Sequence, residues 1–467
     1  MKCCFEEDIE IAELILKETA RQNSVLRLIP SENYISDEVA DALASSFGNK
    51  YSEGYVGKRY YQGTKNIDEL ESLVITRAKT LFNVPHVNVQ PYSGSIANAS
   101  VYFSLLDVGD SLMGMELSSG GHLTHGFPKI TFSGKYFKSF SYPVGKDGFI
   151  DYDLVRDLAV QHRPKMIISG ASSYPRSIDF SKFGEIADEV SAYHVADISH
   201  IAGLVATGLH QSPVEYADVV TTTTHKTLRG PRGAMIMVTK KGLDKDSDLA
   251  NKIDKGVFPG MQGGPHDNTI AGIGVCLGEA LKPEFSDYIS QVVKNAARLA
   301  EELQKAGFDL ITGGTDNHLI LVDIRGKGLD GWLFAWALEY AGIIVNRNAI
   351  PYDPNPPFYP SGVRLGTPAV TSLGLKETDM VKIAGWMKEV ADIAQSIAQN
   401  TGDTVQELTG GGNGLPANLD KNRRKEIRRA FSVDPRLGEI SGAVAKFVSS
   451  FADTGSSVGK GASRRVD

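Results

Sequence analysis

The sequence predicts an α/β fold, with a mostly parallel sheet sandwiched by helices in a large domain and a smaller C-terminal α+β domain. Short β-rich stretches at 165–169, 194–197 and 218–223 are separated by loop or helical sequence, notably at 183–193. Strands that alternate with helices are typical of βαβ units. A length of 467 residues favours two or three domains. Pro283 and the helical run to Ala306 indicate the boundary between them.

The elements before this boundary follow in order. Residues 8–22 carry apolar side chains at helical spacing, whereas the Gly/Tyr-rich segment 48–63 has no periodicity. We then expect a helix over 68–82, a strand over 86–90 and a helix over 93–106 that opens at Ser93-Gly94-Ser95. A returning strand is predicted over 228–238.

Beyond the boundary we expect strands at 318–324 and 364–365 and helices at 331–340 and 378–399. The predicted division is an N-terminal arm and helix (1–50), a large cofactor-binding domain (51–283), a small domain (284–420) and a C-terminal helix with a flexible tail (421–467). Glycine at 410–412 and 414 predicts a flexible break, and Gly/Ser-rich 455–467 a frayed end. Residues 421–429 hold six basic side chains and one acidic one, which we interpret as a solvated helix face.

Composition excludes several classes of protein. Hydrophobic residues make up 42% and charged ones 22%, which is typical of a folded chain. A net charge of −7 gives no global field for nucleic acid or anionic membrane, and no apolar run reaches the ~18 residues of a membrane helix. Three cysteines cannot form a disulfide framework, and the acidic N-terminus does not resemble a signal peptide. We therefore predict a cytoplasmic protein.

Three strand ends carry the candidate chemistry. Lys226 follows the apolar strand that contains Val219 and Val220, and a desolvated amine there suits Schiff-base chemistry. Asp197 ends another buried strand, where a carboxylate can pair with the ring nitrogen of pyridoxal phosphate. Ser93-Gly94-Ser95 opens a helix, where hydroxyl and N–H groups can hold a phosphate. Taken alone, each feature has an ordinary explanation: a surface lysine, a turn aspartate or a helix N-cap. The occurrence of all three at strand ends favours a cofactor site.

The chain resembles the serine (glycine) hydroxymethyltransferase family, whose fold is like that of aspartate aminotransferase. The resemblance covers about residues 26 to 390 in family order. It rests on the strings LIPSEN from Leu28, KYSEGY from Lys50, KRYYQG from Lys58, VQPYSGSIAN from Val89, GGHLTHG from Gly120, TTTTHKTLRGPRG from Thr221, FPGMQGGP from Phe258, GGTDNHL from Gly313 and SGVRLGTPA from Ser361. Pro30, Ile198-Ser199 and Met261 depart from the family pattern without removing an assigned chemical group.

The resemblance implies pyridoxal 5'-phosphate, bound as a covalent aldimine on Lys226, with Asp197 on its ring nitrogen. His122 would stack on the ring, and Ser172 and His200 would tune its electronics. Two sets would hold the phosphate: Ser93, Gly94, Ser95 and His225 from one subunit, and Tyr51, Gly263 and Gly264 from its neighbour. The resemblance thus implies an obligate homodimer and leaves a homotetramer open.

For the substrates, the resemblance implies that Arg364 binds the amino-acid carboxylate, assisted by Ser31 and Tyr61. Glu53 would be the acid/base group near the serine hydroxyl. Thr223 and Arg232 would position the lysine and line the pocket. Contacts to the co-substrate tetrahydrofolate would come from Tyr60, Leu117, Leu123 and Asn348. The implied reaction moves the serine hydroxymethyl carbon to tetrahydrofolate, giving glycine and methylene-tetrahydrofolate.

Two other readings stay open at this point. A folate-independent threonine or β-hydroxy-amino-acid aldolase, or a transaldolase, could use the same scaffold. A non-catalytic module could bind RNA through 421–429, although Lys226, Asp197 and Arg364 argue against it. His122 and His125 have the spacing of a zinc pair, but no Cys or carboxylate cluster supports one, so we expect no metal.

Overall fold

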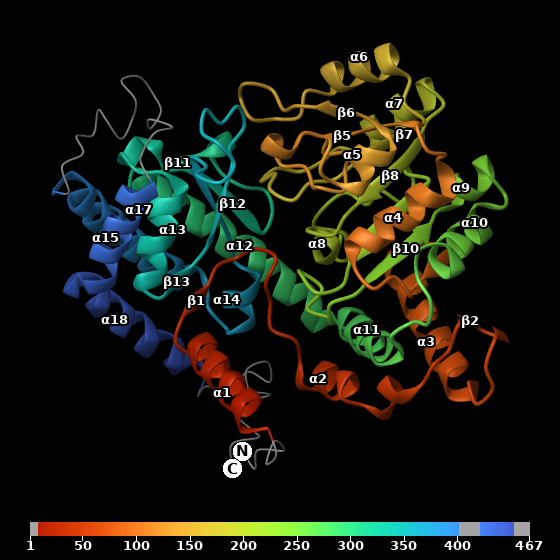
Figure 1. The fold of residues 1–467 in the computed structure, drawn as a ribbon, viewed down its shortest axis with the longest axis horizontal. Helices are drawn as coiled ribbons and strands as arrows, with labels where there is room; N and C mark the ends of the chain where they lie inside the picture. Colours follow the sequence, from red (N-terminus) through yellow and green to blue (C-terminus); the bar gives the residue numbers. More distant parts are fainter. Residues whose placement is uncertain (1–7, 401–420, 453–467) are drawn as a thin grey trace. The chain divides into compact units, whose positions relative to one another are not determined.

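The computed structural model describes residues 8–400 and 421–452 (Figure 1). The chain forms two units, residues 35–290 and residues 1–34 with 291–467. The predicted break at 410–414 and the predicted frayed end at 455–467 lie outside the described residues. No helix among the described residues is long and apolar enough to cross a membrane. The four-part division made from the sequence stays a prediction.

A seven-stranded sheet organises unit 35–290, and it is parallel except at β10, which pairs antiparallel with both β4 and β9. The predicted α/β class with a mostly parallel sheet is confirmed. In spatial order the strands are β4 (His86–Asn88), β10 (Ala234–Val238), β9 (Val219–Thr223), β8 (Tyr193–Asp197), β7 (Met166–Ser169), β5 (Ser111–Met115) and β6 (Lys138–Tyr142).

These strands pack against two groups of helices. Val195 and Val219 pack with helices α4 (Gly94–Leu105) and α10 (Leu249–Lys255). The helices α6 (Tyr152–His162) and α7 (Phe180–Glu189) contact β6, β7 and β8. Because both faces are covered, β7, β9 and β10 are buried at every position, as parallel strands usually are.

This unit also contains helices that do not belong to these two groups. They are α2 (Asp37–Leu43), α3 (Lys65–Phe82), α5 (Phe132–Tyr136), α8 (Ala202–Ala206), α9 (Lys240–Lys245) and α11 (Asp267–Ala280). Helix α11 contacts α2 and α3. It also carries Cys276, whose fully buried Sγ donates to the Leu228 carbonyl over 3.2 Å. Burial raises the pKa of this thiol.

The second unit has a smaller antiparallel sheet, as the α+β prediction requires. Its strand order is β11 (Asp309–Leu310), β12 (Leu319–Asp323), β15 (Gly362–Gly366) and β14 (Asn346–Asn348). A separate parallel pair joins β1 (Leu26–Arg27) to β13 (Ile343–Ile344). The helices are α1 (Ile9–Asn23), α12 (Pro283–Lys305, which begins in the first unit), α13 (Gly331–Tyr340), α14 (Pro368–Ser372), α15 (Glu377–Asn400), α17 (Lys421–Val433) and α18 (Pro435–Ala452).

Three expectations need correction. The returning strand begins at Ala234, because the chain turns at Arg229, whose φ is +61°, and Gly230 N donates to Thr224 O. The segment 48–63 contains a hairpin of β2 (Gly54–Tyr55) and β3 (Lys58–Arg59). Residues 421–429 are not simply a solvated face, because Ile427 is fully buried and Arg424 is 3% exposed.

Candidate active site

Asp197 is the last residue of β8, and its carboxylate is held by two side chains and one backbone amide. Its Oδ2 accepts from His125 Nε2 (3.0 Å) and Asn98 Nδ2 (2.9 Å), and its Oδ1 accepts from Ser199 N (3.0 Å). Asn98 is itself held by Thr221 Oγ1, which donates to its Oδ1 over 2.7 Å. Asp197 is therefore fixed by partners from α4, from the loop after β5 and from the segment that follows β8, and β9 supports the partner on α4.

The ionised form of Asp197 is strongly favoured. Burial opposes ionisation, but the hydrogen bond and charge of His125, together with His122 and the hydrogen bond from Ser199, outweigh it and hold the pKa of Asp197 well below its usual range. Each carboxylate oxygen can accept about two hydrogen bonds, so Oδ1, with Ser199 N as its bonded donor, retains acceptor capacity. A buried anion that can accept one more hydrogen bond suits a cationic N–H group.

Lys226 lies in the turn after β9. Asp197 is the register partner of Thr221, so the lysine loop leaves the same edge of the sheet at which Asp197 sits. The Thr223 amide donates to Ser199 Oγ (3.0 Å), and Thr227 Oγ1 donates to the His200 carbonyl (3.2 Å). These bonds tie both ends of the lysine loop to the segment that follows Asp197.

The start of α4 has the features of a phosphate site. The helix's first backbone bond runs from Ala97 N to Ser93 O, so the amides of the first turn have no partner within the helix. Gly94 fits closely against Thr223, since a Cβ on it would lie 2.7 Å from Thr223 Cγ2. His225 Nδ1 is buried without a hydrogen-bond partner. Burial, with the charges of Lys226 and Arg232, lowers the pKa of His225 to about 3.

A second group of side chains surrounds Glu53. Tyr61 Oη donates to Glu53 Oε2 (3.0 Å), and Tyr51 Oη lies 3.4 Å from Oε1. A Cβ on Gly263 would lie 3.1 Å from Glu53 Oε1, and one on Gly264 would lie 3.0 Å from the Tyr51 ring. The chain therefore brings together five residues that the sequence places in three separate segments.

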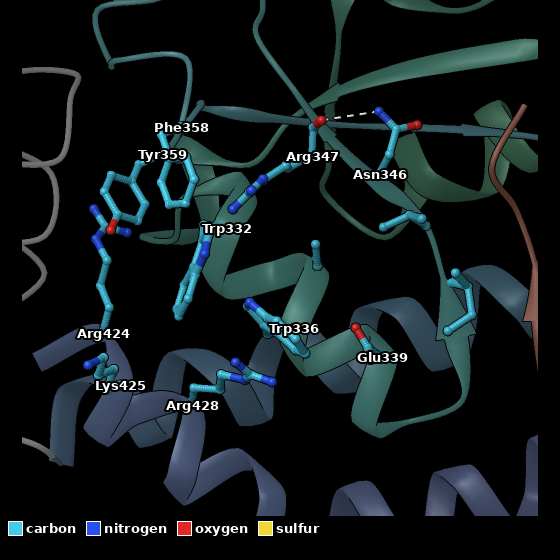
Figure 2. A pocket seen from close by; sticks show the side chains of 13 residues that line it. Trp332, Trp336, Glu339, Asn346, Arg347, Phe358, Tyr359, Arg424, Lys425 and Arg428 are labelled. Carbon is cyan, nitrogen blue, oxygen red and sulfur yellow. Dashed lines mark hydrogen bonds between the residues drawn. The ribbon is translucent and has the colours of Figure 1, made fainter. Parts of the chain in front are cut away.

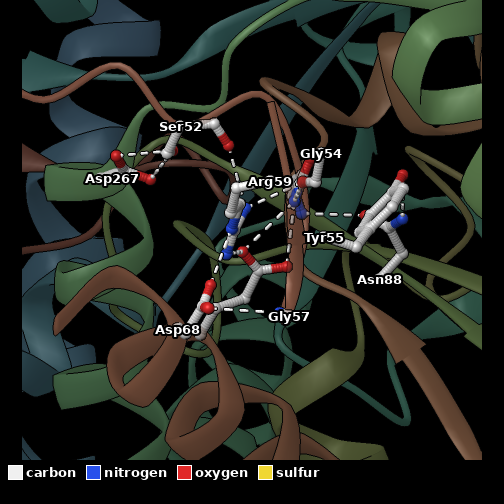
Figure 3. A network of polar contacts seen from close by, with 10 residues as sticks. Ser52, Gly54, Tyr55, Gly57, Arg59, Asp68, Asn88 and Asp267 are labelled. Atoms are coloured by element: carbon white, nitrogen blue, oxygen red, sulfur yellow. Dashed lines mark hydrogen bonds and ion pairs between the residues drawn. The ribbon is translucent and has the colours of Figure 1, made fainter. Parts of the chain in front are cut away.

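Arg59 fixes the backbone on both sides of Glu53 (Figure 3). Its Nη1 donates to the carbonyls of Ser52 (3.0 Å) and Gly54 (2.8 Å). Its other nitrogens pair with Asp68 (2.8 Å) and Glu71 (2.6 Å), and the Arg59 side chain is 2% exposed. This buried network determines where the Glu53 carboxylate is presented.

Two of the three residues predicted to bind the carboxylate, Arg364 and Ser31, lie in the other unit. Arg364 is on β15, and its Nε donates to Asn346 Oδ1 over 3.1 Å. Burial lowers the pKa of Arg364 to about 10, so it stays cationic at neutral pH. Asn348 is the register partner of Gly362 on the same pair of strands. Ser31 follows Pro30, which packs on Gly366, two residues beyond Arg364.

Comparison with known proteins agrees with this constellation. The family model described as serine hydroxymethyltransferase matches residues 5–387. A serine hydroxymethyltransferase of Acidothermus cellulolyticus is 53% identical over 411 residues, covering 86% of this chain and 94% of that protein. The serine hydroxymethyltransferase of Sorangium cellulosum is 55% identical over 392 residues, covering 84% of this chain and 91% of that protein. That of Desulfotalea psychrophila is 53% identical over 392 residues, covering 84% of this chain and 90% of that protein. The chain belongs to the serine hydroxymethyltransferase family.

The remaining residues expected in a serine hydroxymethyltransferase site lie on several loops and turns of unit 35–290. His122 Nδ1 accepts from Thr124 N (3.2 Å), and Ser172 N donates to Gly120 O (2.7 Å), so the loops after β5 and β7 meet. His200 is 5% exposed. Leu117 begins a 3-10 turn ending at Ser119, while Leu123 and Tyr60 are exposed. Arg232 is also exposed.

Sequence reasoning missed three residues that contact the Asp197 carboxylate: Asn98, His125 and Ser199. Asn98 lies in the quoted string VQPYSGSIAN, and His125 was weighed only as a zinc ligand. The structure instead places His125 on Asp197. Within residues 8–400 and 421–452, no three His, Cys, Asp or Glu side chains form a candidate metal site.

Proposed function

We propose that this chain catalyses the reversible transfer of the serine hydroxymethyl carbon to tetrahydrofolate, giving glycine and methylene-tetrahydrofolate. The observation that carries the proposal is the buried Asp197 carboxylate, which accepts from His125 and Asn98 at the sheet edge from which the Lys226 loop leaves. Family membership supports the same reaction.

The residues present fit pyridoxal phosphate, on which the family depends. The orphaned His225 Nδ1, the first turn of α4 and the close-fitting Gly94 form a place for its phosphate, with Ser93 and Ser95. Lys226 would attach it, and Asp197 would hold a proton on its ring nitrogen. When bound, the cofactor supplies an electron sink for cleavage of the bond between Cα and Cβ.

The other side chains bind substrate and move protons. Arg364 would bind the serine carboxylate through a planar, charge-assisted pair. Glu53 would exchange a proton with the serine hydroxyl during cleavage, and Tyr61, 3.0 Å from its Oε2, holds that carboxylate in place. The hydrogen bond to Glu53 raises the pKa of Tyr61, which keeps this hydroxyl protonated as a donor.

We further propose that the working protein is a homodimer in which Tyr51, Gly263 and Gly264 serve the phosphate of the neighbouring subunit. The structural support is that these residues form one group with Glu53.

Serine cleavage measured with and without tetrahydrofolate tests the proposed reaction. We expect the folate to accelerate cleavage, and Glu53→Gln to lower that rate by about 100-fold or more while keeping the visible absorbance of bound cofactor. Lys226→Ala should lose both the rate and the absorbance. Absence of acceleration, together with brisk cleavage of allo-threonine, would instead support the aldolase reading.

A further inference from the structure

A cavity of about 510 Å³ lies within the second unit, between α13, β13–β14, the loop after β14 and α17 (Figure 2). This volume is in the range of sites for small organic ligands. One wall, contributed by Arg424, Lys425 and Arg428 of α17, lies beyond residue 387, where the family match ends. Asn346 of the lining accepts from Arg364 Nε, but no residue of the lining has an assigned role in the proposed reaction.

The cavity is walled by arginines that lie on aromatic rings. The three pairs, as distances from Cζ to the ring centroid, are Arg347 on Phe358 (4.5 Å), Arg424 on Tyr359 (3.8 Å) and Arg428 on Trp336 (3.2 Å). A guanidinium that lies on a ring face keeps N–H donors in its own plane, and its orientation is already fixed. Such groups suit the oxygens of a phosphate or carboxylate.

Positive charge in the cavity exceeds the negative charge available to it. Arg424 is 3% exposed and pairs through Nη1 with the buried Asp330, but its buried Nε has no hydrogen-bond partner. Arg347, Lys425 and Arg428 form no ion pair with any described residue, and Glu339 is the one acidic residue of the lining. Among the described residues, the cationic side chains of the lining therefore outnumber the acidic ones.

The cavity also has aromatic surface for a flat ring. Trp332 lies among the arginine–aromatic pairs, with its ring centroid 6.0 Å from that of Tyr359 and 6.1 Å from that of Trp336. Phe358 is 60% exposed. Figure 2 shows Arg347 projecting from the β14 side and Arg428 from the α17 side of the same space.

We propose that this cavity binds a small organic anion that joins a flat aromatic ring to a phosphate, the chemistry of a nucleoside monophosphate. The ring stacks on Trp332 or Phe358, and the phosphate takes hydrogen bonds from Arg347 and Arg428. Stacking on an aromatic side chain is worth about 1–3 kcal/mol per base, so ring and phosphate are both needed for tight binding.

Titration of the full-length holoenzyme with AMP tests the proposal. Two of the three tryptophans line the cavity, so tryptophan fluorescence reports occupancy directly. We expect saturable quenching by AMP, and binding of adenosine or inorganic phosphate that is weaker by about tenfold or more. Arg347→Gln and Arg428→Gln should each weaken AMP binding by a similar factor. Arg436→Gln is the matched control, because Arg436 lies outside the cavity and pairs with Asp434.

Three results would overturn the proposal. The first is no saturable quenching by AMP up to about 1 mM. The second is equal binding of AMP and inorganic phosphate, which would leave only a general anion site. The third is tighter, Arg428-dependent binding of single-stranded RNA than of AMP, which would assign the surface to nucleic acid. Thermal unfolding of each variant checks its fold, and Arg347→Gln, at a half-buried residue, is informative if Arg428→Gln fails to fold.

Discussion

His194 is a fully buried residue in the middle of β8. Its Nε2 lies 2.8 Å from Ser169 Oγ, and its Nδ1 lies 2.9 Å from the Tyr216 carbonyl, which accepts only from a protonated nitrogen. The ring is thus held as a neutral tautomer, and burial lowers its pKa to about 4. Because of this histidine, the stability of the folded protein is sensitive to acid.

The pH dependence follows from the lowered pKa. The unfolded chain, with a His pKa of about 6.5, binds the proton first as pH falls, so the folded state loses stability between pH 6.5 and 4. We expect His194 alone to remove about 2 kcal/mol between pH 7 and 5. Urea unfolding at both pH values measures it: His194→Gln should reduce the loss, and His162→Gln, at a half-buried position, should not. An equal loss in wild type and His194→Gln would contradict this assignment.

At the residue scale, the sequence was sufficient to place Lys226 and Asp197 at the ends of strands, because each ends or follows a recognisable buried strand. It was not sufficient for the residues that set the charge state of Asp197. His125 and Asn98 reach it across 72 and 99 positions of the chain, and no local pattern encodes those contacts. Their roles depend on tertiary packing.

At the scale of elements, the hairpin β2–β3 was missed for a related reason. Each of its strands has two residues, too few to show a period of two. Side-chain bonds from Arg59 to the Ser52 and Gly54 carbonyls hold this segment instead. Longer elements such as α3 and α4 were predicted to within a few residues, because they bury whole faces.

The Arg59 network gives a prediction for this hairpin. Lysine cannot reproduce the planar set of donors, so Arg59→Lys should leave buried partners unsatisfied and cost about 1–3 kcal/mol of unfolding free energy. Because Glu53 would lose its position, folate-dependent serine cleavage should fall more than the affinity for serine. Kinetics and urea unfolding measure both effects. Arg77→Lys is the control, because Arg77 donates a hydrogen bond to Gly274 O. An unchanged rate of serine cleavage in Arg59→Lys would exclude the positioning role of Arg59.

At the scale of the whole molecule, the proposed dimer can be tested by complementation. Lys226→Ala and Glu53→Gln subunits, carrying different tags, can be mixed and the heterodimer isolated. If Glu53 serves the lysine of the neighbouring subunit, one site per heterodimer is intact and about half of the wild-type activity returns. If both residues serve the same subunit's site, every site carries one lesion. The heterodimer would then stay as inactive as its parents.

The burial of Cys276 has a consequence for the lifetime of the enzyme. Its Sγ lies beneath the loop that follows Lys226, and a Cβ on Gly230 would lie 2.7 Å from it. Oxidation of a thiol requires an accessible thiolate, and here burial both covers the sulfur and disfavours its ionisation. Within residues 8–400 and 421–452, the folded chain thus has no thiol that peroxides can reach. Oxidation of Cys276 is therefore not expected to disturb the packing of the lysine loop.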